Sequence, residues 1–195
     1  MTEHRLFSEG TIPEHTRPDW YADRDRAPHL EQAAHGLRLR TAADFVVRAG
    51  VRAGVTTVVD LGAGDGGLLS LLPEPFIGWG YDLQPTNVTA ACDERRVDVR
   101  LGDVVEGDIE WGDIAVATEM LEHLVDPHAF VRRIAEHSPI LIASSPWGET
   151  SDDHYEFHTW AWDRGGYAAL LEQAGYAIRA HTLVGPFQVV AGVRA

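Results

Sequence analysis

Short apolar runs alternate with stretches of helically spaced apolar positions along most of the chain. The runs, several of them rich in β-branched residues, predict strands at 55–59, 76–81, 97–101, 114–118 and 140–143. Helical spacing and stop signals predict helices at 29–49, 66–72, 85–95, 127–137 and 164–174. Alternating strands and helices indicate a parallel sheet covered on both faces, with ligands at the carboxyl ends of its strands.

Local signals set the expected boundaries of these elements. Gly50 is a plausible stop for the first helix, and Pro85 suits the first residue of a later one. Asp126 and Asp163 are expected N-caps. Two last apolar runs, 176–183 and 187–193, are joined by a Gly-Pro turn and predict an antiparallel hairpin. We therefore expect an α/β, Rossmann-like, mostly parallel seven-stranded sheet that ends in an antiparallel hairpin.

The first part of the chain has a different character. Residues 6–28 mix three prolines with Trp20, Tyr21 and alternating charges, without a clean period. We interpret residues 1–28 as an arm or lid and residues 29–195 as the core of a single domain.

Composition narrows the function classes. The formal net charge of the 195 residues is −14, which disfavours a broad nucleic-acid-binding face. All 16 basic residues are Arg, which excludes a Schiff-base lysine and a Walker-type phosphate loop. The single Cys92 excludes an intrachain disulfide, and no apolar run reaches the roughly 20 residues of a membrane span. We expect a cytoplasmic protein without a membrane partner.

A glycine-rich turn follows the first predicted core strand. Gly62, Gly64 and Gly67 form the pattern G-x-G-x-x-G, which is typical of dinucleotide sites but weak alone. Acidic residues are predicted at the ends of four neighbouring strands, at Asp60, Asp82, Asp103 and Glu119. Four carboxylates would repel a pyrophosphate and suit a cationic ligand whose ribose hydroxyls need acceptors.

These residues carry a resemblance to a known family. From about Leu30 onward the sequence resembles class I S-adenosylmethionine (SAM)-dependent methyltransferases, whose D/E-x-G-x-G-x-G motif stands here at 60–66. The resemblance implies that SAM is the methyl donor. It implies that the turn wraps the methionine and ribose, that Asp82 binds the ribose hydroxyls, and that Asp103 with the Val104 amide binds adenine. The cofactor-binding residues expected on this basis are Arg38, Asp60, Gly62, Ala63, Gly64, Asp82, Leu83, Asp103, Val104 and Glu119.

A second motif follows the fourth predicted strand. Its segment Glu119-Met-Leu-Glu122-His123 is closely similar to one in ubiquinone-type O-methyltransferases, which would imply a phenolic hydroxyl acceptor. The same E-x-x-E-H pattern, with a later His158, resembles small-RNA 3′-terminal ribose methyltransferases. In those enzymes the four side chains bind a divalent metal, so the resemblance implies Mg²⁺ or Mn²⁺.

We expect methylation of a small-molecule acceptor, preferably at an oxygen. His123 or His158 is the expected acid–base residue, Glu119 or Glu122 orients it, and no metal is obligatory. The alternatives are a metal-assisted RNA ribose 2′-O-methyltransferase and a non-catalytic SAM-binding module. A dehydrogenase is disfavoured, because 195 residues leave no room for a separate substrate domain. The expected partner is a small molecule rather than nucleic acid, and a homodimer stays open.

Overall fold

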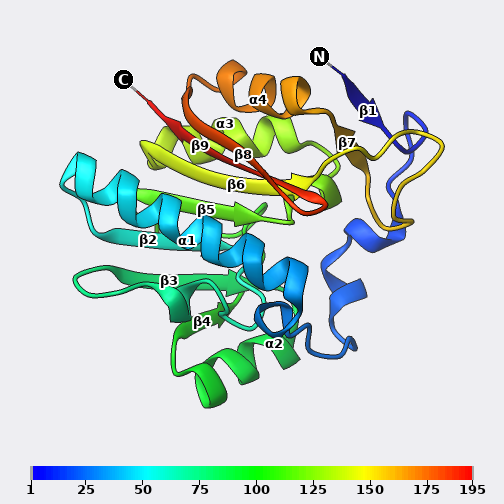
Figure 1. Ribbon diagram of the computed structural model, residues 1–195. Coiled ribbons are helices and arrows are strands. Elements are labelled where there is room, and N and C mark those ends of the chain that lie inside the picture. The colour runs from blue at the N-terminus through cyan, green and yellow to red at the C-terminus, as the bar shows by residue number, and fades with distance from the viewer. Residues whose placement is uncertain (1, 195) are drawn as a thin grey trace.

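The central sheet has the strand order β4-β3-β2-β5-β6-β9-β8 in this computed structural model, which describes residues 2–194 (Figure 1). The strands are β2 (Thr57–Leu61), β3 (Ile77–Asp82), β4 (Asp98–Leu101), β5 (Ile114–Thr118), β6 (Ile140–Pro146), β8 (Ala177–Val184) and β9 (Phe187–Val193). Strands β2 to β6 pair in parallel, whereas β9 runs antiparallel to both β6 and β8. The expected fold class and the C-terminal hairpin are confirmed.

Helices cover both faces of this sheet (Figure 1). They are α1 (Ala33–Ala53), α2 (Pro85–Ala90), which continues as a π-helical turn (Ala91–Arg95), α3 (Pro127–His137) and α4 (Arg164–Gln173). Successive residues of the central strands point to opposite faces. Thus Ile114 and Val116 pack against α1, and Ala115 and Ala117 belong to the core beneath α3 and α4. Strand β5 is buried at all of its residues, and its first four residues, Ile114 to Ala117, are accordingly apolar.

The first helix differs from the predicted one at both ends. Residues 29–31 form a separate 3-10 turn, and α1 runs through Gly50 to Ala53. Gly54, with φ of 71°, is the left-handed residue that ends it. Gly50 serves packing instead: a Cβ there would lie 2.5 Å from the Phe76 ring and 2.8 Å from the Val55 carbonyl oxygen. The expected stop at Gly50 is therefore wrong.

The helix expected at 66–72 is also wrong. Only a 3-10 turn at Leu69–Leu71 forms there. Gly66 has φ of 75°, a left-handed conformation that a right-handed helix excludes. The glycine turn thus extends further than its pattern predicts.

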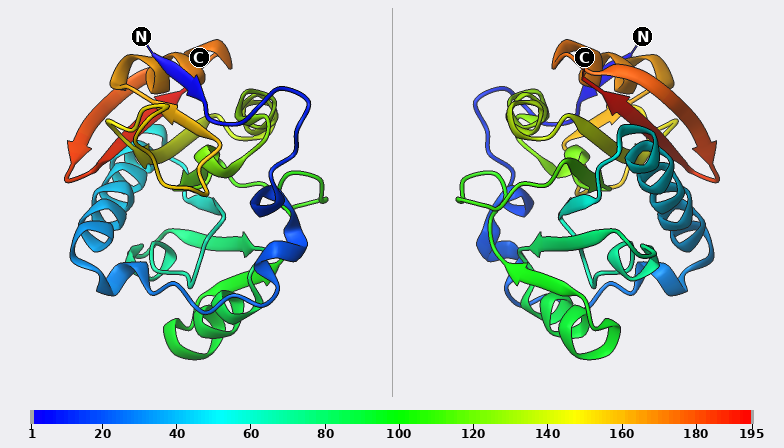
Figure 2. Two further views of the ribbon diagram at one scale, coloured as in Figure 1. Left: turned by 90° about the vertical axis from the view of Figure 1, so that its right-hand side faces the viewer. Right: turned by 90° about the vertical axis from the view of Figure 1, so that its left-hand side faces the viewer.

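The N-terminal arm crosses the carboxyl edge of the sheet (Figure 2). It begins with β1 (Glu3–Arg5), which pairs antiparallel with β7 (Trp160–Trp162), a two-stranded sheet that the sequence did not predict. The Trp162 indole donates to Glu3 Oε2 at 2.8 Å and anchors this start. Two 3-10 turns follow, at Glu14–Thr16 and Pro18–Tyr21. Over residues 2–194, none of the helices has the length and apolarity to cross a bilayer.

Candidate active site

A cavity of about 770 Å³ lies at the carboxyl ends of β2 to β5, with the arm along one side. Between β2 and β5 the strand order reverses, because β3 and β4 follow on one side and β6 on the other. Open α/β sheets bind ligands at such a switch point. Its walls include the expected residues Arg38, Asp60, Gly62, Ala63, Gly64, Asp82, Leu83, Asp103, Val104, Glu119 and His123. The tertiary structure therefore gathers eleven of the twelve predicted site residues around one space, and the twelfth, His158, stands next to His123.

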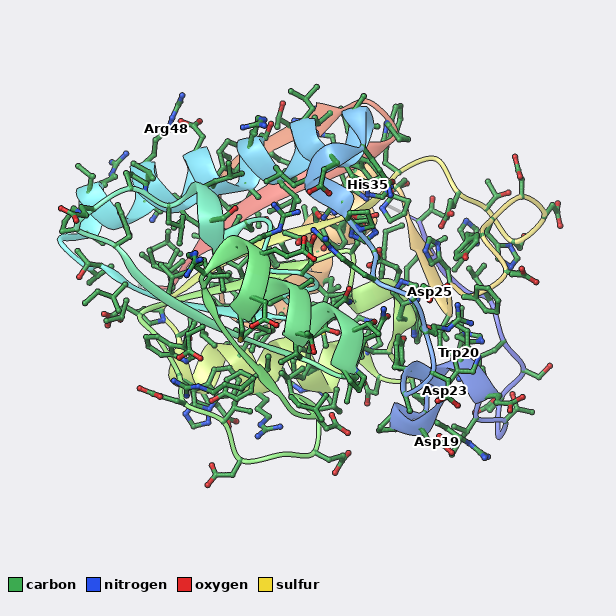
Figure 3. The ribbon with its side chains drawn as sticks, turned by 90° about the horizontal axis from the view of Figure 1, so that it is seen from below. Asp19, Trp20, Asp23, Asp25, His35 and Arg48 are labelled. Carbon is green, nitrogen blue, oxygen red and sulfur yellow. The ribbon has the colours of Figure 1, made fainter. Side chains whose placement is uncertain are left out.

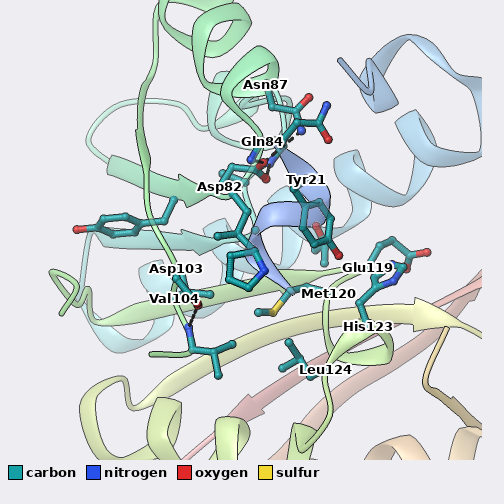
Figure 4. Close-up of a pocket in the computed structure, with 18 of the residues that line it drawn as sticks. Tyr21, Asp82, Gln84, Asn87, Asp103, Val104, Glu119, Met120, His123 and Leu124 are labelled. Carbon is teal, nitrogen blue, oxygen red and sulfur yellow. Dashed lines mark hydrogen bonds between the residues drawn. The ribbon is translucent and has the colours of Figure 1, made fainter. Parts of the chain in front are cut away.

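The glycine turn depends on left-handed glycines and on hydrogen bonds to Asp82. Gly62 and Gly64 have φ of 78° and 56°, which residues with a side chain rarely adopt. The Gly64 N–H donates to Asp82 Oδ2 at 2.8 Å, and the Gln84 N–H donates to Oδ1 at 2.9 Å (Figure 4). Asp82 thus braces the turn while it faces the cavity. Burial raises the pKa of the Asp82 carboxyl, and these backbone donors oppose the rise.

Asp60 lies at the end of β2 and is 1% exposed. Its Oδ1 has no hydrogen-bond partner. Burial, followed by the nearby Asp82, raises the pKa of Asp60 to about 7, against the attraction of Arg38. A cationic group in the cavity would favour the ionised form of this carboxyl.

After β4, the Asp103 carboxylate stabilises a loop instead of remaining unpartnered. Asp103 Oδ1 accepts from the Val105 N–H at 2.8 Å, which turns the chain back toward the sheet. Arg133 from α3 donates to the Val104 carbonyl oxygen at 3.0 Å and so holds the loop from the other side. Figure 4 shows Asp103 and Val104 together on the wall opposite Tyr21.

Arg38 and Glu119 lie close together in the wall of the cavity. Arg38 is 1% exposed, and its Nη1 lies 3.1 Å from Ser144 Oγ and 4.0 Å from Glu119 Oε1. Glu119 has φ of 54°, an uncommon value for a residue with a side chain. Such strain is often found at functional sites. Burial raises the pKa of Glu119, and the Arg38 guanidinium opposes this.

Glu122 is the most unusual group in the region. Its side chain is fully buried, and neither carboxyl oxygen has a hydrogen-bond partner. Burial and the neighbouring Glu119 hold its pKa well above the ordinary value. Buried polar groups in proteins are nearly always partnered, so an orphaned carboxyl needs an explanation.

Two imidazoles stand beside this carboxyl. His123 Nδ1 lies 2.9 Å from the Phe157 carbonyl oxygen, and His158 Nδ1 lies 2.7 Å from Glu149 Oε2. A carbonyl and a carboxylate only accept, so the Nδ1 of each ring carries the proton, and in the neutral ring Nε2 keeps its lone pair. Burial, with the neighbouring His158, lowers the pKa of His123 to about 4, so this ring is neutral at pH 7.

Three of the four side chains of the metal-binding alternative come together in space, and Glu119 is not part of this group. One donor atom each from Glu122, His123 and His158 lies within 4.8 Å of the others. The two rings are 4.9 Å apart. Glu119 and His123 line the cavity itself, and Glu122 and His158 lie next to them.

Several residues at the site were not found from the sequence. From the arm, Trp20, Tyr21 and Arg24 line the cavity, and so does Phe157 from the loop before β7. In Figure 4 the Tyr21 side chain reaches between Asp82 and Glu119. The only available signal was the aromatic character of the irregular arm, which gives no contact partner. Glu149, which fixes His158, carried no signal.

Comparison with known proteins agrees with this geometry. Residues 29–181 match the family model described as a methyltransferase domain. Among curated proteins, none matches the sequence significantly.

Solved structures show the same fold at low sequence identity. A magnesium protoporphyrin IX methyltransferase from Synechocystis with bound SAH has a TM-score of 0.68 at 16% identity and covers 90% of this chain and 91% of its own. The methyltransferase domain of bacterial CtHen1-CN has a TM-score of 0.64 at 24% identity and covers 83% and 100%. The [4+2]-cyclase SpnF has a TM-score of 0.67 at 16% identity and covers 89% and 85%.

Proposed function

The chain belongs to the methyltransferase-domain family, and on this premise we propose that it methylates a hydroxyl oxygen of a small-molecule acceptor. It is a SAM-dependent methyltransferase of the Rossmann-like class, with SAM as its methyl donor. The observation that carries the acceptor chemistry is the Glu122, His123 and His158 cluster beside the cavity. Its two imidazoles are held in the tautomer that leaves Nε2 free to take a proton or a cation.

The donor half of the cavity suits SAM in charge and shape. In the proposed pose, the left-handed turn at Gly62 to Gly64 lets the backbone approach the methionine and ribose, and Asp82 accepts from the ribose hydroxyls. Asp103 and Val104 hold the adenine. Asp60 and Glu119 face the cationic part of the donor, and Arg38 takes its carboxylate. A bound sulfonium and ammonium would offset the mutual repulsion of these buried carboxylates.

In the methyl-transfer step, the acceptor oxygen attacks the methyl carbon as the carbon–sulfur bond breaks. The bonding pair stays on sulfur, so the sulfonium becomes a neutral thioether. The hydroxyl proton passes to His123 Nε2, because His123 lines the cavity and its Nδ1 is already engaged. His158 and Glu149 position this ring. The cavity would hold donor and acceptor in line, which supplies much of the rate.

A second form of the proposal adds a divalent cation, and the orphaned Glu122 favours it. The residues fit such an ion: Glu122 has two unpartnered oxygens, and in each ring the contact made by Nδ1 leaves Nε2 available as a ligand atom. Glu119 stays outside this three-residue group and contacts Ser144 and Arg38 instead. When bound, Mg²⁺ or Mn²⁺ would lower the pKa of the acceptor hydroxyl.

Chelation separates the two forms. Label from radioactive SAM is followed onto 3,4-dihydroxybenzoate before and after EDTA treatment. Binding of Mn²⁺ is measured separately by electron paramagnetic resonance. The cation form predicts loss of transfer, recovery with Mg²⁺ or Mn²⁺, and Mn²⁺ binding that Glu122→Gln abolishes. Transfer that survives EDTA, with no Mn²⁺ binding, would leave His123 as the base without a metal.

The control variant is Glu136→Gln, which removes an exposed carboxylate of α3 outside the cavity and should change neither readout. The acceptor class is tested in the same assay with a short RNA that carries a free 3′-terminal ribose. Label on the RNA and none on small hydroxylated molecules would contradict the proposed acceptor. The net charge of −14 and the arm across the cavity support a small molecule.

A further inference from the structure

Four arginines line the cavity, and three of them are either engaged in contacts or exposed to solvent. Arg38 contacts Ser144 and Glu119, and Arg133 donates to backbone carbonyl oxygens of the loop after β4. Arg17 is exposed. Within residues 2–194, the guanidinium of Arg24 forms neither an ion pair nor a hydrogen bond, and its Nε is buried without a partner. In a chain of 30 acidic and 16 basic residues, such a guanidinium at the active site needs an explanation.

Aromatic rings hold Arg24 in place without using its donors. The guanidinium carbon lies 3.1 Å from the centre of the Trp20 ring and 5.2 Å from that of Phe157. Stacking on a ring occupies the face of the guanidinium, whereas its N–H donors lie in the plane and remain available. The two rings are 4.9 Å apart and form one apolar wall.

This wall is joined directly to the reacting end of the cavity. Phe157, whose ring contacts Arg24, is also the residue whose carbonyl oxygen accepts from His123. Phe157, a residue of the loop before β7, therefore connects Arg24 to His123, the proposed general base. Because the guanidinium covers a face of Trp20 and the two rings are tilted by 57°, a planar acceptor would pack against Phe157 with its hydroxyl toward His123.

We infer that Arg24 recognises an anionic group on the acceptor, so that the substrate is a planar hydroxylated molecule bearing a carboxylate or a phosphate. The inference rests on the proposed function and adds the substrate class. A planar fork of N–H donors matches a carboxylate or phosphate with two parallel hydrogen bonds. The net charge of −14 disfavours an anion in the cavity, and a cationic partner offsets that repulsion.

Matched pairs of acids and neutral analogues test the inference. Calorimetry with the SAH-loaded protein compares 3,4-dihydroxybenzoate with 3,4-dihydroxybenzamide, and adenosine 5′-monophosphate with adenosine. The first pair tests a carboxylate and the second a phosphate. At least one anion should bind about 10- to 100-fold more tightly than its neutral partner. Arg24→Gln should abolish that preference, and Arg24→Lys should retain part of it because the charge remains.

The control is Arg48→Gln, which removes one positive charge from the outer side of α1, away from Trp20 (Figure 3). It should leave the preference intact. The SAH affinity of Arg24→Gln should equal that of the unaltered chain. A large loss there would assign Arg24 to the donor and overturn the inference. Equal binding within both pairs, or no binding of either anion, would also overturn it.

The same measurements keep this inference separate from the proposed function. If anions bind through Arg24 but no label reaches a hydroxyl, only the methyl-transfer proposal fails. If neutral and anionic acceptors are methylated equally well, the methyl-transfer proposal stands and the inference fails.

Discussion

At the residue scale, burial decides which groups near the cavity carry charge. His123 is neutral at pH 7 because burial lowers its pKa to about 4, and Asp60 is close to half protonated because burial raises its pKa to about 7. The pKa of Glu122 is raised well above the usual value of a carboxyl. Ligand binding at this site is therefore coupled to proton release.

The low pKa of His123 predicts a pH dependence of stability. Below pH 6.5 the unfolded chain takes up a proton at this residue, whereas the folded chain does so only near pH 4. The contribution of His123 to the free energy of unfolding is nearly constant above pH 6.5, and it falls as the pH is lowered toward 4. Between pH 7 and 5 it should cost about 2 kcal/mol of unfolding free energy. Urea unfolding of the unaltered chain and of His123→Gln at both pH values measures it.

The difference between the two proteins isolates His123, because Asp60 titrates in both. The raised pKa of Asp60 acts in the opposite direction, since the folded state gains a proton there as the pH falls below 7. When the pH is lowered from 7 to 5, the free energy of unfolding of His123→Gln should rise by about 2 kcal/mol relative to that of the unaltered chain. An unchanged difference would mean that His123 is accessible to protons in the folded state.

At the element scale, the length of α1 depends on two glycines with different roles. Gly50 lies inside the helix where Phe76 and the Val55 carbonyl approach, and Gly54 ends it in a left-handed conformation with open space around it. Gly50→Ala should lower the free energy of unfolding by about 1–3 kcal/mol, because the added methyl overpacks a closed contact. Chemical denaturation measures this loss.

Gly54→Asn is the matched control. Asn tolerates the left-handed region, and nothing lies within 4 Å of the new Cβ, so the loss should stay below about 1 kcal/mol. A smaller loss for Gly50→Ala than for Gly54→Asn would show that Phe76 moves aside easily and that Gly50 is not a packing residue.

At the scale of the whole molecule, the arm is tied to the glycine turn and to the loop after β3. Arg26 pairs with Asp65 of the glycine turn at 2.8 Å, and Arg95 reaches the same carboxylate at 2.7 Å. The Ala27 N–H donates to Asn87 Oδ1, and the Asn87 amide in turn donates to Asp82. Residues 6–28 stay a predicted cover of the acceptor site, and these contacts link that cover to the loops around the donor.

Replacing residues 12–24 by a Gly-Ser linker tests the cover. The change keeps β1 paired with β7 and leaves Arg26 and Ala27 in place, so the core should still fold and bind SAH within a few-fold of the unaltered chain. Methyl transfer should be lost, because water enters the acceptor side and the Trp20 wall is gone. Calorimetry and the radioactive transfer assay measure the two effects.

The matched control is a Gly-Ser linker over 8–11, which keeps the contacts of Leu6 and Phe7 with Thr159 and Trp160 and does not line the cavity. It should leave both readouts unchanged. Full transfer by the protein without residues 12–24 would show that the arm does not cover the acceptor.

The sequence determined the strands of the central sheet, most of the helices that cover it, and which acidic residues gather at its carboxyl edge. Strand residues that are apolar on both faces, N-caps such as Asp126 and Asp163, and the glycine turn after Asp60 act through neighbours in the chain. Because the carboxyl ends of parallel strands share one edge, four acids spaced along the sequence were expected to gather, and all four line the cavity.

Only the tertiary structure decided the acceptor half. Trp20 and Arg24 meet Phe157, and Glu149 fixes His158, through contacts that no local period encodes. The role of Gly50 likewise depended on Phe76, which is distant in sequence, so a residue that resembles a helix stop proved to be a packing position. The loss of hydration at Glu122 was also invisible in the sequence. Burial is a property of the packed molecule, and burial sets the charge of this carboxyl and of His123.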